Sequence, residues 1–299
     1  MYDFGEVYEP SSIDEALLTM SEHPQAKILA GGSDLLIQMR SGMHSGIEII
    51  SIYGIDELRG VTICEDGSIR IGALISMSHI VKSDIIQNHC PVLAEAVGKL
   101  GGPQIRNIAT IGGNVCNGHT GADSGAALVA LQALVELRTK SGTRTITIDE
   151  YYKETGGAGL KSGELLTAFI IPQNSYNDYF GAHYKYSMRN AMDVDVTGCC
   201  TVVKLSKDMK TIDDVRIAFG VMGPYPCRAK EAEDAVRGKE ITKELIALFA
   251  DKSVEGLSPR TDYRATREFR LHTARTMAKR TFCEALQKAG CEIQLKEAF

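Results

Sequence analysis

Two glycine-bearing segments decide how this chain folds: LAGGSDL at residues 29–35 and ATIGGNVCNGHTGAD at residues 109–123. The first overlaps the apolar run KILA, residues 27–30, which predicts a short buried strand. Glycine permits positive φ and lets backbone N–H groups approach an anion closely, and Ser33 adds a hydroxyl donor. The Gly-Gly pair alone favours a plain strand-to-helix turn, and residues 35–39 open either a helix or a bent strand.

The second segment is rich in glycine and asparagine, which are poor formers of both helix and strand. We therefore predict a loop over residues 108–123 whose N–H groups face a ligand. It is not a nucleoside-triphosphate loop, because His119 stands where that motif needs a lysine. Neither segment supplies G-x-G-x-x-G within a βαβ unit, so a Rossmann dinucleotide site is also poorly supported.

Around these segments, apolar spacing and turn residues predict an α+β chain. Helices are expected at residues 12–20, 91–100 and 126–131, and strands at 47–52, 61–64, 68–71, 134–139 and 144–148. A polar, turn-rich stretch at residues 173–178 marks a domain boundary. Beyond it we expect strands at 198–205 and 214–220, and helices from 229, from 242 and over 261–286. The cations of the last helix are expected to form a solvated or partner-facing surface: Arg264, Arg267, Arg270, Arg275, Lys279 and Arg280.

The whole-chain composition excludes several classes of function. At 299 residues the chain is long enough for two domains with separate cores. A net charge of −5 without a basic arm argues against a nucleic-acid partner. The acidic N-terminal sequence and the lack of a long apolar run predict a cytoplasmic protein with no membrane partner. None of the eight cysteines sits in a C-x-x-C pair, which predicts reduced, mostly buried thiols and no metal or iron–sulfur site in this chain.

The sequence shows no constellation of residues for acid–base catalysis. His119 has no serine or cysteine nucleophile with an evident base beside it. Asp3, Asp34, Asp123 and Asp193 are scattered and give no paired-carboxylate spacing. We therefore assign no catalytic residue, which fits a protein whose chemistry belongs to a bound cofactor.

Taken together, the two glycine segments resemble the two FAD-binding signatures of the FAD-binding (medium) subunits of molybdenum hydroxylases. The flavin subunits of xanthine dehydrogenase and nicotinate dehydrogenase are members of that family. The resemblance continues, in the family's order, through GPQIRN at 102–107, KYSMR at 185–189, AMD at 191–193, P-x-P-x-R-A at 224–229, DYRA at 262–265 and FR at 269–270. It therefore covers nearly the whole chain.

The resemblance implies a fold and a set of contacts to non-covalently bound FAD. It implies an FAD-binding domain over residues 1–176, in two α+β subdomains at about 1–55 and 56–176, and a smaller α+β domain with an antiparallel sheet over 177–299. The first segment is expected to bind the pyrophosphate through Lys27, Leu29, Ala30, Gly31, Gly32, Ser33, Asp34 and Leu35. The second is expected to hold the pyrophosphate, ribityl or adenosine portion through Thr110, Ile111, Gly112, Gly113, Asn114, Cys116, Asn117 and Asp123. Leu100 or Gly101 is expected against the isoalloxazine, Leu165 or Leu166 near the flavin or adenine, and Lys185 near the flavin ring.

The implied function is electron transfer within a larger complex. An iron–sulfur subunit would supply electrons that a molybdopterin subunit takes from a purine or nicotinate-like heterocycle, and NAD, NADP or another acceptor would receive them. Where some relatives place an aromatic ring over the flavin, this chain has Leu100. Two other hypotheses stay open: a self-sufficient flavin oxidase or reductase with its own substrate, and a non-enzymatic assembly subunit.

Overall fold

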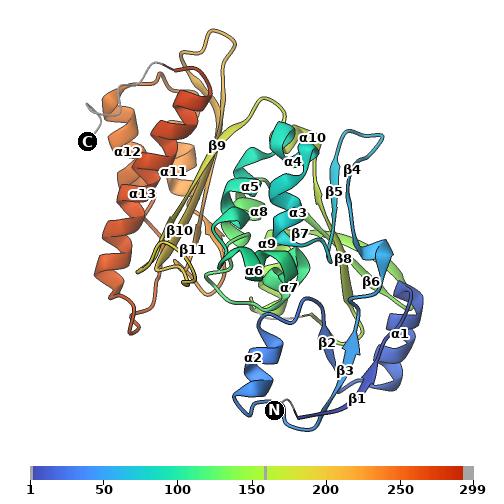
Figure 1. The fold of residues 1–299 in the computed structure, drawn as a ribbon. Helices are drawn as coiled ribbons and strands as arrows, with labels where there is room; N and C mark the ends of the chain where they lie inside the picture. The colour runs from blue at the N-terminus through green and yellow to red at the C-terminus, as the bar shows by residue number, and fades with distance from the viewer. Residues whose placement is uncertain (1–2, 158–159, 292–299) are drawn as a thin grey trace.

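The computed structural model describes residues 3–157 and 160–291, and it arranges them around three sheets (Figure 1). The first sheet has the order β1-β3-β2 and is parallel, with β1 at Phe4–Tyr8, β2 at Lys27–Leu29 and β3 at Ile47–Ser51. Two helices accompany it, α1 at Ile13–Glu22 and α2 at Leu35–Arg40. The apolar face of α1 packs with Ile50 and Ile52 in a small core of its own.

The second sheet is antiparallel and has the order β4-β5-β8-β6-β7. Its strands are β4 Val61–Ile63, β5 Ile69–Gly72, β6 Leu134–Thr139, β7 Gly142–Thr147 and β8 Leu165–Ile171. A short 3-10 turn, Asp56–Leu58, precedes it. The helices that follow in the chain are α3 Met77–Lys82, α4 Asp84–His89, α5 Pro91–Gly98, α6 Pro103–Ile108, α7 Ile111–Cys116, α8 Gly125–Ala130, α9 Ile148–Thr155 and α10 Gln173–Tyr176. These helices lie largely between the second and third sheets (Figure 1).

The third sheet is antiparallel, with the order β12-β11-β10-β9. Its strands are β9 Phe180–Tyr186, β10 Thr197–Leu205, β11 Ile212–Gly220 and β12 Cys227–Arg228. Helices α11 Lys230–Val236, α12 Lys243–Lys252 and α13 Arg267–Lys288 cover one face of this sheet and form a core with it (Figure 1). The opposite face contacts α5 and α8, so residues of β10 and β11 also join the core around the second sheet.

The predicted α+β class, with a two-part N-terminal region and an antiparallel C-terminal sheet, is confirmed. The division after residue 176 stays a prediction. Strands β1 and β9 were not predicted. In β1 most side chains are exposed, and β9 begins with a glycine-bearing stretch, so neither shows a clear apolar alternation. Within residues 3–157 and 160–291, no helix combines the length and the apolarity that a bilayer crossing requires.

Candidate functional site

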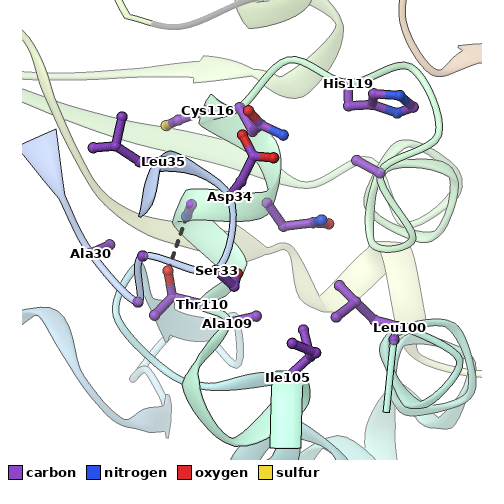
Figure 2. Close-up of a pocket in the computed structure, with 18 of the residues that line it drawn as sticks. Ala30, Ser33, Asp34, Leu35, Leu100, Ile105, Ala109, Thr110, Cys116 and His119 are labelled. Atoms are coloured by element: carbon purple, nitrogen blue, oxygen red, sulfur yellow. Dashed lines mark hydrogen bonds between the residues drawn. The ribbon is translucent and has the colours of Figure 1, made fainter. Parts of the chain in front are cut away.

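A cavity of about 930 Å³ lies where the two glycine segments meet (Figure 2). This volume is at the upper end of the range for small-molecule sites, about 300–1,000 Å³. Every residue predicted to contact the cofactor lines it, except Ile111 and Lys185. Ile111 is fully buried in the core behind the cavity. Figure 2 shows Ser33 and Thr110 close together on one side of the cavity and Leu100 on another.

The first segment offers the cavity a run of hydrogen-bond donors. The backbone N–H groups of residues 31–34 have no acceptor among the residues that the structure describes. Gly32 has a φ of +71°, a conformation that other residues rarely adopt. A Cβ added to Gly31 would overlap the carbonyl oxygen of Ile108, so this glycine allows the first segment to touch the second. Unpaired N–H groups arranged in succession form a site suited to an anion.

The second segment is not the loop that its composition predicted: its first half is helix α7. Thr110 caps this helix, because its side chain accepts a hydrogen bond of 3.1 Å from the N–H of Gly113 (Figure 2). Gly112 lies against the turn that follows β5, where an added Cβ would be 2.8 Å from the Cβ and the carbonyl oxygen of Ala73. Here glycine permits close packing of a helix rather than loop flexibility. The prediction failed because glycine content alone does not separate these two uses.

Gly113, the next residue of α7, faces the cavity instead. An added Cβ would meet the hydroxyl of its own cap, Thr110, and Ala30 at 4.0 Å across the cavity, and nothing else within that distance. Further along, Asn114 accepts hydrogen bonds from the backbone N–H and the hydroxyl of Ser124. The second segment therefore exposes a bare backbone to the cavity while its polar side chains fasten it internally.

The cavity has lining residues that the sequence analysis did not assign: Gln38, His44, Ile105, His119, Arg189, Met192, Tyr263 and Arg264, among others. Four of them, Arg189, Met192, Tyr263 and Arg264, fall in motifs that carried the family resemblance, and in those motifs only Lys185 was given a role. Membership in these motifs was therefore the sequence signal that could have identified them as lining residues. Leu100 is largely buried, whereas Tyr263, a lining residue from the C-terminal region, is 86% exposed.

The segment carrying Tyr263 and Arg264 is fastened by a buried arginine. Helix α13 begins at Arg267, after a turn in which the Asp262 carboxylate accepts from the N–H of Arg264 at 2.9 Å. Arg270 donates to that same carboxylate and to the Val196 carbonyl, each at 2.7 Å. The prediction that this arginine is solvated or partner-facing is wrong, as is the start of the helix at residue 261.

His119 is held in one neutral tautomer. Its Nδ1 accepts a hydrogen bond of 3.0 Å from the N–H of Gly121, which places the ring proton on Nε2. Burial and then the nearby Arg260 and Arg264 lower the pKa of His119 below its usual value. The ring therefore adds a donor, and no charge, to the cavity wall at neutral pH.

Lys185 lies behind the cavity wall rather than in it. Its ammonium is 2.6 Å from Asp123 Oδ1 and 3.1 Å from Asp195 Oδ1, and its side chain is only 7% exposed. Of these three residues only Asp123 lines the cavity. The surface-lysine alternative is thus excluded by burial, while a direct contact of Lys185 with the flavin ring stays a prediction.

These residues fit FAD as a group. Successive N–H groups at residues 31–34, which have no acceptor within the described ranges, and the bare backbone at Gly113 suit a pyrophosphate. Apolar side chains such as Leu100, Ile105 and Leu165 offer surfaces for flat rings.

Comparison with known proteins defines the class to which this fold and site belong. Residues 2–174 match the family model described as the FAD binding domain in molybdopterin dehydrogenase, and residues 182–285 match the CO dehydrogenase flavoprotein C-terminal domain. The chain therefore belongs to the family of FAD-binding subunits of molybdopterin-dependent dehydrogenases, which are oxidoreductases, and its cofactor is FAD.

Individual relatives match over almost the full chain. The xanthine dehydrogenase FAD-binding subunit of Escherichia coli O157:H7 is 36% identical over 294 residues, covering 98% of this chain and 100% of that protein. The nicotinate dehydrogenase FAD-subunit of Eubacterium barkeri is 30% identical, covering 82% of this chain and 83% of the relative. A solved structure of carbon monoxide dehydrogenase from Hydrogenophaga pseudoflava, lacking the Mo-pyranopterin moiety of its molybdenum cofactor, superimposes with a TM-score of 0.88 at 29% identity, covering 96% of this chain and 99% of that one.

Proposed function

We propose that this chain is the electron-transfer subunit of a multi-subunit molybdenum hydroxylase. It takes electrons from iron–sulfur clusters on a partner subunit and passes them to NAD, NADP or another acceptor, while a molybdopterin subunit hydroxylates a purine or nicotinate-like heterocycle. The observation that carries the proposal is the cavity, whose wall combines unpaired backbone donors with apolar surfaces. The names of the xanthine and nicotinate dehydrogenase relatives support the class of substrate.

The backbone of the first segment holds the cofactor's pyrophosphate in this proposal. The N–H groups of residues 31–34 have no competing acceptor among the described residues, so they are free to donate to phosphate oxygens. The side chains of Ser33 and Thr110 lie close together beside this backbone (Figure 2). Gly113 completes the site by leaving room for close approach.

The two ends of the cavity hold the two ring systems. We assign the isoalloxazine to the end lined by Leu100, Gly101, Ile105 and Met192, beside the C-terminal region, and the adenosine to the end lined by Leu165. Bound FAD accepts electrons singly and releases them in pairs, which connects one-electron to two-electron carriers. This chain's residues position the ring and exclude water from its buried edge.

The location and partners of the chain follow from the same proposal. All eight cysteines are unpaired thiols, which fits a reducing compartment, and we propose a cytoplasmic location. Within the described ranges no group of His, Cys, Asp and Glu is placed to hold a metal ion. We therefore assign the iron–sulfur clusters and the molybdopterin to other subunits of the complex.

The test is electron transfer with and without partners. The FAD-loaded chain is mixed anaerobically with NADH, with NADPH, and with a reduced iron–sulfur subunit from the same complex, and the flavin absorbance is followed. We expect reduction by the iron–sulfur subunit, and no oxidation of xanthine or nicotinate by the isolated chain under air. Oxidation of such a substrate by the chain alone would establish a self-sufficient oxidase, and a folded chain that takes up no FAD would establish an assembly subunit.

A further inference from the structure

A buried cluster of three charged side chains lies directly behind the cavity. Lys185, on β9, stands between Asp123, which follows α7, and Asp195, which precedes β10. The side chains are 7%, 10% and 2% exposed, respectively. The ammonium donates a hydrogen bond of 2.6 Å to Asp123 and lies 3.1 Å from Asp195. Two carboxylates thus share one cation away from solvent.

The cluster carries one negative charge too many when all three groups are ionised. Asp195 Oδ1 is buried and accepts no hydrogen bond from the described residues, although the ammonium is at ion-pair distance. Its Oδ2 packs against the backbone of Gly198, where an added Cβ would overlap it. An uncompensated charge in such surroundings is costly, and a carboxyl group that takes up a proton removes that cost.

Groups on the surrounding elements do not supply the missing positive charge. The titratable and charged side chains that face the cluster are His119 from its own loop, His183 from β9, Lys99 from the end of α5, Asp193 from the segment before β10, and Arg270 from α13. His119 and His183 are neutral, because burial lowers the pKa of each, and Asp193 adds negative charge. The Lys99 side chain is exposed, and only the backbone carbonyl of this residue contacts the cluster. Arg270 is already committed to the Asp262 carboxylate and the Val196 carbonyl.

The ionisation equilibria of the cluster reflect this imbalance. Burial, and then the neighbouring Asp123, raise the pKa of Asp195 to about 7 against the opposing effect of Lys185. Burial likewise raises the pKa of Asp123. Burial alone would lower the pKa of Lys185, but the two carboxylates outweigh it and raise that pKa, so the lysine stays charged.

The cluster is also part of the cavity wall at one particular end. Asp123 lines the cavity. The Lys185 ammonium lies 3.3 Å from the carbonyl oxygen of Lys99 and donates to it, and the next residue, Leu100, lines the end that we assign to the isoalloxazine. A negative charge that appears in that end of the cavity therefore acts on the cluster through buried protein of low dielectric constant.

We propose that the Asp123–Lys185–Asp195 cluster takes up one proton from solvent when the bound flavin is reduced. The flavin takes two electrons and one proton, so it gains one negative charge. The second proton binds to the pair of carboxylates, Asp123 and Asp195, on either side of Lys185. The flavin and the cluster together therefore gain no net charge. The inference rests on the proposed function, because it requires the isoalloxazine at this end of the cavity.

The test is the pH dependence of the flavin's midpoint potential in the FAD-loaded chain. One proton per two electrons makes reduction tenfold less favourable per pH unit, about 30 mV, whereas two protons make it a hundredfold, about 60 mV. Above about pH 7, where Asp195 is ionised while the flavin is oxidised, we expect the midpoint potential of the wild type to fall by about 60 mV per pH unit. In Asp195→Asn we expect it to fall by about 30 mV per pH unit. Asp251→Asn, which removes an exposed carboxylate paired with Arg275 far along α12, serves as the matched control and should behave as the wild type.

Two further measurements on the wild type keep the result decisive if Asp195→Asn does not fold. A pH indicator should report two protons taken up per flavin reduced above pH 7, and infrared difference spectra should gain a protonated-carboxyl band on reduction. One proton per flavin and no new band would overturn the inference while leaving the proposed function intact. A chain that binds no FAD would overturn both.

Discussion

The two glycine segments have similar compositions and opposite uses of their backbone. In residues 31–34 the N–H groups lack internal acceptors in the described part of the chain, and all four residues line the cavity. In residues 110–117 most N–H groups bond within α7 and its cap or to the segment that follows β5. Gly31 and Gly112 allow close contact between chain segments, whereas Gly113 leaves space for a ligand. A glycine in a sequence therefore does not reveal whether its bare face meets a cofactor or a neighbouring helix.

The largest expected effect comes from Gly31→Ala, which tests whether the two segments must touch. The added Cβ would overlap the carbonyl oxygen of Ile108, and both atoms belong to backbone that cannot simply rotate away. We expect FAD affinity, measured by fluorescence titration, to fall at least a hundredfold, about 2.8 kcal/mol. Gly54→Ala is the control, because nothing lies within 4 Å of its added Cβ, and it should bind FAD as the wild type does. Unchanged affinity in Gly31→Ala would contradict this role.

Gly112→Ala tests the packing use of glycine. Its Cβ would lie 2.8 Å from Ala73, so we expect the free energy of unfolding, measured in urea, to fall by about 1–3 kcal/mol. FAD affinity should fall less than in Gly31→Ala. Adding Ala73→Gly should restore part of the stability, since it removes one of the two close atoms. If the single variant is as stable as the wild type, α7 does not depend on this contact.

Gly113→Ala sharpens the comparison within one helix turn. Alanine gains about 0.5–1 kcal/mol of helix stability over glycine, and this offsets the disturbance of the Thr110 cap. We expect the free energy of unfolding to change by less than about 1 kcal/mol, while FAD affinity falls about tenfold, 1.4 kcal/mol. The opposite pattern, lost stability with intact FAD binding, would show that the assignments of Gly112 and Gly113 are exchanged.

The sequence was sufficient for the features that depend on local pattern and on the ordered family motifs. It predicted the strand at residues 27–30, the α+β class and half of the residues that line the cavity. It missed α7, because helix propensity is a weak guide where tertiary packing against Ala73 and a threonine cap decide the conformation.

The remaining errors concern partners that are distant in the chain. Arg270 looked like one of a row of solvated cations, but its acceptors, Asp262 and the Val196 carbonyl, meet it only in the folded structure. The two carboxylates that enclose Lys185 come from the loop before α8 and the segment before β10, which no sequence periodicity connects. Spacing along a sequence carries no information on such contacts.

The most direct test of the central claim is the absorption spectrum of the purified chain before and after acid precipitation, with the released compound identified. A cavity that holds FAD through unpaired backbone donors predicts a yellow protein that releases FAD into the supernatant, since no covalent attachment is involved. A colourless, folded chain that also fails to take up added FAD would contradict the account. Flavin that stays with the precipitated protein would contradict the claim that FAD is bound non-covalently.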